Sequence, residues 1–142
     1  MNNWLERTEL LLGEEKLARL RSANVLVVGV GGVGAYAAEM IVRAGVGRMT
    51  IADADKVSET NINRQLVALH STVGKEKCEV LAERLRDINP DLELKMVNRF
   101  IKDSETDALL DSEKFDYVLM ELELSDIIGQ IKAAQTVCGN DS

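Results

Sequence analysis

Four glycines and one aspartate are the residues whose types and spacing first point to chemistry in this sequence. Gly29, Gly31 and Gly34 fit the pattern G-x-G-x-x-G, and Gly32 adds one more glycine. Glycines at this spacing permit a tight turn after a strand and let backbone N–H groups at a helix start approach a phosphate. Asp53 follows near the ~20-residue distance at which a carboxylate binds ribose hydroxyls. The pattern predicts a nucleotide site; a purely structural glycine turn and a turn-forming Asp53 are the alternatives.

Two cations extend this set. Arg64 lies in a polar stretch, residues 53–74, which also contains Asn61 and Gln65, and an arginine can bind phosphate oxygens in a bidentate manner. Lys77 lies near a predicted helix start, where a positive charge opposes the helix dipole, and such local misfits are typical of functional sites. Two cations are more than a nicotinamide dinucleotide requires. They suit a triphosphate attacked at its α-phosphorus, with Mg²⁺ on the departing pyrophosphate. A solvated Arg64 and a snorkelling Lys77 are the alternatives.

The apolar pattern predicts the elements that would position these residues. A buried strand over residues 25–28 leads through the glycines into a helix that runs to about residue 44 and ends at Gly45. A second strand, residues 48–52, places Asp53 at its carboxyl end, where ligands bind in such sheets. The remaining elements are predicted as helices over 14–20, 74–88, 105–110 and 126–137 and strands over 91–97 and 115–120.

This order of elements predicts an α/β fold. We expect a Rossmann-like, doubly wound, mostly parallel sheet with helices on both faces and the strand order 3-2-1-4. The fourth strand, residues 115–120, is expected to be buried. Trp4, residues 10–12 and Cys78 are expected to pack in the interior, and Ser104 is expected to cap the helix that follows it.

Composition excludes several classes of protein. The chain has 142 residues and a formal net charge of −7, which argues against a strong, diffuse nucleic-acid binder but leaves room for a local basic patch. Cys78 and Cys138 are isolated, so no zinc motif is visible. Free thiols without a signal sequence predict a cytoplasmic protein, and no apolar stretch is long enough to span a membrane. His70, a lone histidine, is given no role.

Several motifs, in order, resemble a known family. They are GVGGVGAYAAEMIVRAGVGRMTIADADKVSETNINRQ at residues 29–65, VGKEK at 73–77 and DINP at 87–90. Together they resemble the adenylating domain of the ubiquitin-activating superfamily, which includes the activators of the molybdopterin and thiamine sulfur carriers. The segment TNINRQ, together with RTELLLG at residues 7–13, is most similar to the branch of tRNA threonylcarbamoyladenosine dehydratases.

The resemblance covers about residues 7–118 and leaves 119–142 unmatched. It implies that residues 1–142 form a nucleotide-binding adenylating domain equivalent to the N-terminal half of the full family domain. The implied reaction is ATP-dependent adenylation of a carboxylate. In that branch it is the threonyl carboxylate of threonylcarbamoyladenosine at tRNA position 37, which then closes with loss of water. The implied cofactors are ATP and Mg²⁺, and the implied partners are tRNA and a second copy of the chain.

The resemblance also implies roles for individual residues. Arg7, which the sequence alone favours as a solvated side chain, resembles an arginine that reaches into the partner subunit's site in a homodimer. The nucleotide site would consist of the glycine loop (Gly29, Gly31, Gly32 and Gly34), Asp53 on the ribose, Asn61, Arg64 and Gln65 along the phosphates and reacting centre, and Lys77 on the phosphates.

One departure from the family and three alternatives accompany this interpretation. Residues 119–123, LMELE, contain no aspartate where the family carries a D-x-x-D stretch that helps to bind Mg²⁺, so the metal ligand is unassigned. The first alternative is an activator of the C-terminus of a sulfur-carrier or ubiquitin-like protein. The others are a NAD-binding oxidoreductase, which would not need Arg64 and Lys77, and a nucleotide-binding fragment without turnover.

Overall fold

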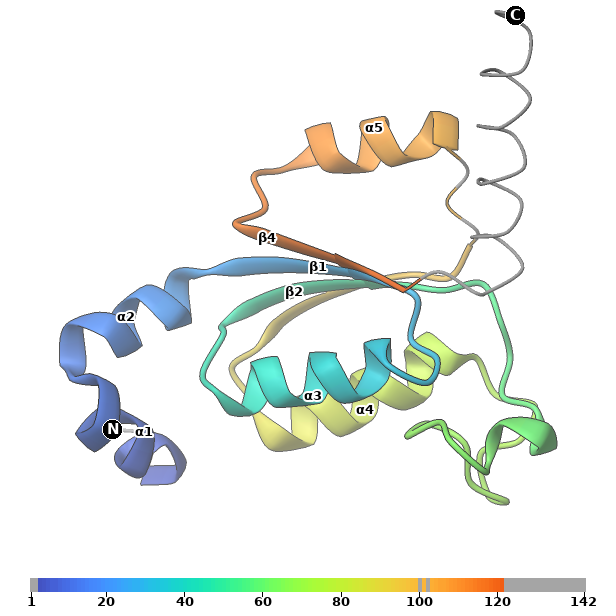
Figure 1. Ribbon diagram of the computed structural model, residues 1–142, viewed down its shortest axis with the longest axis horizontal. Coiled ribbons are helices and arrows are strands. Elements are labelled where there is room, and N and C mark those ends of the chain that lie inside the picture. Colours follow the sequence, from blue (N-terminus) through green and yellow to red (C-terminus); the bar gives the residue numbers. More distant parts are fainter. Residues whose placement is uncertain (1–2, 100, 102, 122–142) are drawn as a thin grey trace, which may run out of the picture.

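A four-stranded parallel sheet forms the centre of the computed structural model, which describes residues 3–99, 101 and 103–121. The strands are β1 (Asn24–Val28), β2 (Arg48–Ala52), β3 (Glu93–Val97) and β4 (Tyr117–Met120). They lie in the order β3-β2-β1-β4, and every neighbouring pair is parallel (Figure 1). The predicted fold class and strand order are therefore confirmed.

Helices lie on both faces of this sheet. Helices α3 (Gly34–Arg43) and α4 (Lys77–Ile88) cover one face, and α5 (Asp103–Ser112) lies on the other (Figure 1). Cys78 on α4 is fully buried, as predicted, in the core between the helices and the strands. Gly45, with a φ of 114°, follows the end of α3 as expected of a glycine in that position.

The N-terminal segment packs at the amino ends of the strands. It consists of the short 3₁₀-helix η1 (Asn3–Leu5), α1 (Glu6–Leu12) and α2 (Glu14–Ser22). The expected burial of residues 10–12 is wrong for Leu10 and Leu11, which are 81% and 83% exposed, and Trp4 is partly exposed, at 39%. The reason is that α1 packs against α2 and η1 rather than against the sheet.

The fourth strand differs from its prediction. Tyr117, Val118 and Met120 are exposed, although an apolar strand was expected to be buried. Because β4 pairs with β1 alone, it forms an edge of the described sheet, and an edge strand loses the cover that a neighbouring strand would supply. The helix predicted over 105–110 is present and longer than expected, since α5 begins at Asp103 and ends at Ser112. The helix predicted over 126–137 lies outside the described residues.

A long connection leaves the carboxyl end of β2 and returns at α4. It contains the 3₁₀-helix η2 (Glu59–Asn61) and extends beyond the sheet (green in Figure 1). Its two arms meet where Val57 N–H donates to the Lys75 carbonyl and Gly74 N–H donates to the Val57 carbonyl, each at 2.8 Å. Val67 is buried against the core. The connection is therefore anchored at the sheet edge where the predicted site lies.

No helix in the described part of the chain combines the length and apolarity that crossing a membrane requires.

Candidate functional site

The glycine turn between β1 and α3 is the centre of the site. Gly29 has a φ of 88°, a conformation that favours glycine. A Cβ on Gly34 would lie 1.8 Å from the Gly29 carbonyl oxygen, so the first turn of α3 approaches the end of β1 more closely than any side chain permits. The glycine spacing therefore serves local sterics, and the same geometry leaves backbone N–H groups free of helix partners at the start of α3.

Three of these N–H groups converge on one carboxylate. Gly31 N–H and Gly34 N–H donate to Oε2 of Glu121, at 3.0 and 2.9 Å, and Val33 N–H donates to Oε1 at 2.9 Å. We call the N–H groups of Gly31, Val33 and Gly34 the amide nest. Convergent amides at a helix N-terminus make a binding site for an anionic group. The nest therefore has the geometry of a phosphate site, and in this structure the Glu121 carboxylate stands in for the anion.

Asp53 lies beside the nest, as predicted. Its Oδ2 accepts the N–H of Val30 at 2.9 Å, and its Oδ1 accepts the N–H of Asp55 at 2.8 Å. The carboxylate is thereby fixed at the carboxyl end of β2, one residue from the nest. Because each carboxylate oxygen can accept more than one hydrogen bond, the group retains the capacity to accept ribose hydroxyls.

Gln65 reaches the nest from the long connection. Its side chain is buried, and its Nε2 lies 3.4 Å from the position that a Cβ on Gly31 would take. Its Oε1 is buried without a hydrogen-bond partner among the residues that the structure describes. Buried polar atoms are nearly always paired, so an unpaired acceptor at this place indicates a site for a donor. Asn61 instead uses its amide oxygen locally, where it accepts the N–H of Ser58 at 2.9 Å.

The two predicted cations differ in burial and in hydrogen-bond partners. Lys77 is buried, with its Nζ 3.8 Å from Oδ2 of Asp55, and its backbone N–H donates to the Asp55 carbonyl at 3.1 Å. The snorkelling alternative for Lys77 is therefore wrong, and its ammonium lies at the edge of the sheet that carries Asp53. Arg64 is exposed, and its Nη1 donates to the Thr60 carbonyl at 3.2 Å and to Oδ1 of Asn63 at 2.9 Å.

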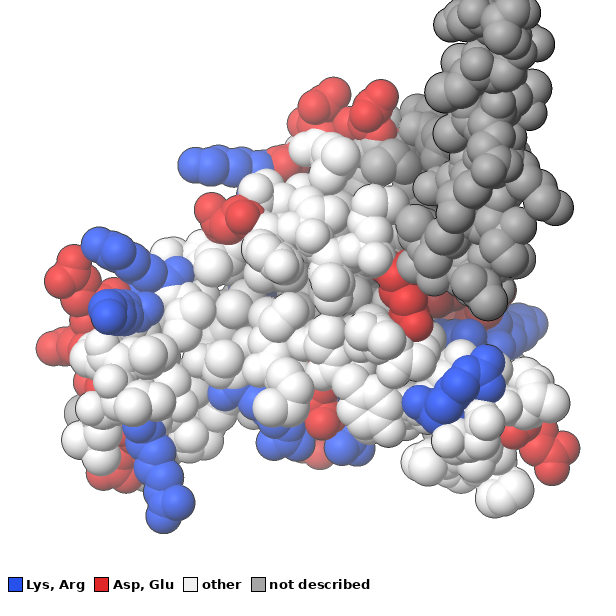
Figure 2. Space-filling model, in the orientation of Figure 1, with Lys and Arg blue, Asp and Glu red and all other residues white. Residues whose placement is uncertain are grey.

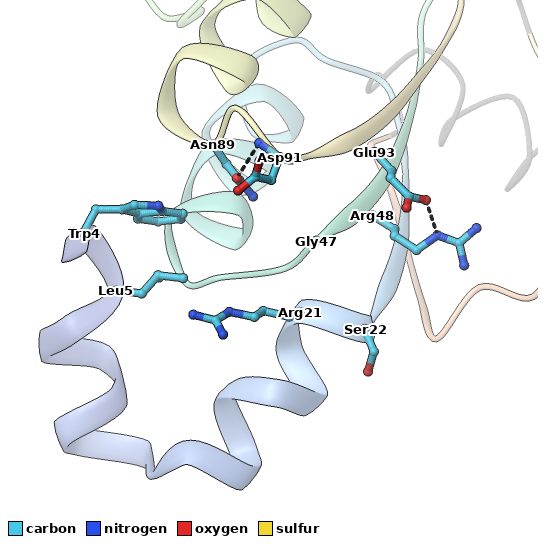
Figure 3. Close-up of a pocket in the computed structure, with 9 residues that line it drawn as sticks. All are labelled: Trp4, Leu5, Arg21, Ser22, Gly47, Arg48, Asn89, Asp91 and Glu93. Atoms are coloured by element: carbon cyan, nitrogen blue, oxygen red, sulfur yellow. Dashed lines mark hydrogen bonds and ion pairs between the residues drawn. The ribbon is translucent and has the colours of Figure 1, made fainter. Parts of the chain in front are cut away.

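Arg7 is not part of this site within one chain. It lies on α1, at the amino ends of the strands, whereas the glycine turn lies at the carboxyl ends (Figure 1). The amino-terminal end carries a cavity of about 570 Å³ beside Trp4, Arg21 and Arg48, and none of the predicted site residues lines it (Figure 3). The Arg48 Nε is held 3.0 Å from Oε2 of Glu93 at its margin. The predicted nucleotide residues and this cavity are therefore separate features.

The charge distribution on the surface and the grouping of potential metal ligands are relevant to the predicted partners and metal. On the face shown in Figure 2 the centre is largely uncharged, and Lys, Arg, Asp and Glu lie mainly around its margin without forming a continuous basic patch. Within the described ranges no three His, Cys, Asp or Glu residues gather as a metal site. Burial, reinforced by the charge of Asp53, raises the pKa of the Cys78 thiol to about 12.

Glu121 is the functional-site residue that sequence reasoning missed. Its position directly after β4 places it at the carboxyl edge of the sheet, and that position was readable from the strand prediction. The family pattern predicts a metal-binding aspartate in this stretch, not a glutamate that binds backbone amides. An acidic residue that turns back into the glycine loop has no local sequence signal, because its partners are almost ninety positions earlier in the chain.

Comparisons with known proteins agree with this geometry. The ThiF family model matches residues 5–126. A Bacillus subtilis tRNA threonylcarbamoyladenosine dehydratase is 43% identical over 119 residues, which cover 84% of this chain and 46% of the relative. An Escherichia coli molybdopterin-synthase adenylyltransferase is 40% identical over 91 residues, which cover 64% of this chain and 36% of the relative.

Solved structures give the same result. The E. coli tRNA N6-threonylcarbamoyladenosine dehydratase in complex with ATP has a TM-score of 0.80 at 40% identity, covering 87% of this chain and 51% of that one. E. coli MccB with ATP has a TM-score of 0.75 at 25% identity, covering 92% of this chain and 40% of that one. The chain spans less than half the length of the curated relatives described above.

Proposed function

The chain belongs to the ThiF family, and we propose that its amide nest binds the phosphates of ATP for the adenylation of a carboxylate. The observation that carries this proposal is the convergence of three backbone N–H groups on a single anionic group beside Asp53. A site of this kind stabilises negative charge without a protein nucleophile, which is what attack at a phosphate requires.

The proposed reaction has two steps. A carboxylate oxygen bonds to the α-phosphorus of ATP while the bond to pyrophosphate breaks, and the activated carboxyl group then reacts with loss of AMP. The names of the dehydratase relatives support the threonyl carboxylate of threonylcarbamoyladenosine in tRNA as the substrate, with closure to a cyclic form as the second step. Activity on tRNA also supports a cytoplasmic location for the protein.

The residues at the sheet edge take the following roles in the proposal. Asp53 accepts the ribose hydroxyls, and Gln65 lines the reacting centre with its Oε1, which has no hydrogen-bond partner in the described part of the chain. Lys77 turns from Asp55 to the phosphates, since the 3.8 Å separation of that pair is long for a charged hydrogen bond. Arg64 and Asn61 reach the phosphates from the long connection only if they exchange their present local hydrogen bonds for the ligand.

Two parts of the proposal concern groups outside this chain. Mg²⁺ would accompany the triphosphate and offset charge on the departing pyrophosphate, and no ligand for it is assigned. A homodimer would bring Arg7 of one copy to the site of the other. The exposed Leu10 and Leu11 on the same short helix support a partner surface there, because large apolar side chains gathered on one helix favour protein contacts.

The first test is ligand-dependent thermal stability. ATP with Mg²⁺ is expected to raise the melting temperature of this chain, because a ligand that binds only the folded state stabilises it, and NAD⁺ is expected to have no such effect. A larger shift with NAD⁺ would favour the oxidoreductase alternative. No shift with either nucleotide would contradict the assignment of the nest to phosphates.

The second test removes the two cations. Lys77→Ala and Arg64→Ala are each expected to weaken ATP binding roughly tenfold or more, the loss of one hydrogen bond to a charged group, as measured by calorimetric titration. The matched controls are Lys16→Ala and Arg19→Ala, which alter exposed cations on α2 at the other end of the sheet. Unchanged affinity in both site variants would remove these cations from the phosphate site.

The third test identifies the substrate. ATP–pyrophosphate exchange that depends on tRNA carrying threonylcarbamoyladenosine supports the dehydratase reaction. Exchange that depends instead on a protein with a Gly-Gly C-terminus favours a sulfur-carrier activator. The assay is run on this chain beside a version continued through a complete second half of the family domain. Exchange that is absent from both, despite ATP binding, would leave a nucleotide-binding protein without adenylation.

A further inference from the structure

The end of β4 brings Glu121 against the glycine turn. Glu121 N–H donates to the Val28 carbonyl at 2.8 Å, which continues the pairing of β4 with β1 by one residue. The Cβ of Glu121 then lies 3.0 Å from the position that a Cβ on Gly29 would take. The backbone of Glu121 is thus fixed beside the turn, and its side chain has only a short distance to span.

The carboxylate of Glu121 takes all three donors of the amide nest. Oε2 is shared by Gly31 and Gly34, and Oε1 is bound by Val33. The first turn of α3 contains no acidic residue of its own, so Glu121 supplies the negative charge that a helix N-terminus favours. Hydrogen bonds to an ionised acceptor are about twice as strong as neutral ones, so this contact is a favourable one.

A phosphate group and this carboxylate cannot use the nest together. The oxygens of a phosphate bound to the three N–H groups would take the positions of Oε1 and Oε2, and two anions in contact repel each other. Glu121 would have to leave the nest before a phosphate could enter.

Gln65, next to the nest, has a buried acceptor that the Glu121 carboxylate cannot satisfy. The Nε2 of Gln65 lies 3.4 Å from the position that a Cβ on Gly31 would take, and its Oε1 is buried without a hydrogen-bond partner among the residues that the structure describes. An ionised carboxylate only accepts hydrogen bonds, so Glu121 supplies no donor for that oxygen. A ligand that carries a donor, such as a ribose hydroxyl or a hydrated cation, would satisfy that atom. The site therefore contains one feature that Glu121 satisfies and a second that it leaves unsatisfied.

We propose that Glu121 is an internal competitor for the phosphate site, which raises the apparent Kd of this chain for nucleotides. The inference rests on the proposed function, since it assigns phosphate to the same nest. A site that is open in only a fraction of molecules has an apparent Kd raised by the inverse of that fraction. Closure by Glu121 in ten molecules for each open one would weaken binding about elevenfold.

The test compares Glu121→Gln and Glu121→Ala with the parent chain in calorimetric titrations with ATP and with inorganic pyrophosphate. Both variants are expected to bind each ligand roughly tenfold more tightly, because the competing charge is gone. The matched control is Glu83→Gln on the exposed side of α4, which changes the net charge equally without touching the nest. Adenosine, which has no phosphate, is expected to bind the parent chain and the variants equally.

Amide chemical shifts give an independent measurement without any ligand. The ¹⁵N–¹H signals of Gly31, Val33 and Gly34 are expected to move in Glu121→Gln and to stay in place in Glu83→Gln. The melting temperatures of the variants establish that each is folded.

The outcomes separate this inference from the proposed function. ATP affinity that is measurable and equal in all forms overturns the competitor and leaves the nucleotide site standing. Pyrophosphate binding that tightens in the Glu121 variants, with no ATP binding in any form, supports the competitor and contradicts the nucleotide function. Absence of binding of either ligand to every form overturns both.

Discussion

Gly34→Ala is the substitution that most directly tests the close approach of the glycine turn to α3. A Cβ at this position would lie 1.8 Å from the Gly29 carbonyl oxygen, whereas contacts below 3.0 Å are essentially never made by real Cβ atoms. The carbonyl would have to retreat by more than 1 Å, the difference between these two distances. It is not free to do so, because the same planar peptide group carries the Val30 N–H, which is held to Oδ2 of Asp53 at 2.9 Å.

The expected cost follows from this geometry. Overpacking a well-ordered site costs about 1–3 kcal/mol, and a clash with a fixed backbone belongs at the upper end of that range. A loss of about 3 kcal/mol lowers the melting temperature of a domain of this size by about 10 °C. The same displacement turns Gly34 N–H away from the nest, so ATP affinity is expected to fall as well.

Two glycines provide matched controls. A Cβ on Gly32 would meet only Oε1 of Glu121, at 3.8 Å, so Gly32→Ala is expected to change stability by less than ~0.5 kcal/mol. A Cβ on Gly47 would lie 2.1 Å from the Arg21 carbonyl oxygen at the other end of the sheet. Gly47→Ala is therefore expected to destabilise the fold while the affinity of the folded molecules for ATP is retained.

The assay is thermal unfolding, followed by ATP titration at a temperature where all three variants are folded. Equal melting temperatures for Gly34→Ala and Gly32→Ala would refute the steric argument. Loss of ATP affinity in Gly47→Ala to the same extent as in Gly34→Ala would show that the effect on binding is not local to the turn.

Two further predictions concern titratable groups. Burial raises the pKa of the Cys78 thiol to about 12. A Cys138→Ser variant, in which Cys78 is the one remaining cysteine, should therefore resist iodoacetamide at pH 8 when folded and react quickly in urea. Rapid reaction of the folded form would contradict the burial of the thiol. Hydrogen bonds from Lys95 and Asn24 lower the pKa of Glu113. The stability that these bonds contribute is therefore present above about pH 4.3, the ordinary glutamate pKa. It is lost as the pH falls through the lowered pKa of the folded state. Glu113→Gln should therefore lower the melting temperature at pH 7 more than at pH 3, and an equal difference at both pH values would contradict this linkage.

The errors of sequence reasoning have a common cause in this chain. Leu10 and Leu11 are apolar, yet they are exposed because α1 packs against α2 and η1 instead of the sheet. The apolar β4 is exposed because it is an edge of the described sheet. In both cases hydrophobicity predicted burial, but burial also requires a neighbour, and the identity of the neighbour depends on the path of the whole chain.

The residues of the candidate site also differ in whether their placement could be predicted from the sequence. Asp53 was predicted at the glycine turn because a parallel sheet gathers its carboxyl ends at one edge, and its contact with Val30 N–H confirms that placement. Gln65 was predicted at the site, and its burial beside Gly31 agrees. The direction of the Arg64 guanidinium was not predictable, since it depends on which of several acceptors in an exposed loop it meets.

The residues of this chain determine by themselves the strand, the glycine turn and the helix around residues 24–43, because backbone sterics at glycine act over a few neighbouring residues. They also determine the parallel order of the strands, through the alternation of apolar runs with helices. Only the tertiary structure decides which anion lies in the amide nest. Glu121 and Gly31 are ninety positions apart, and their contact exists because folding places the end of β4 beside the end of β1.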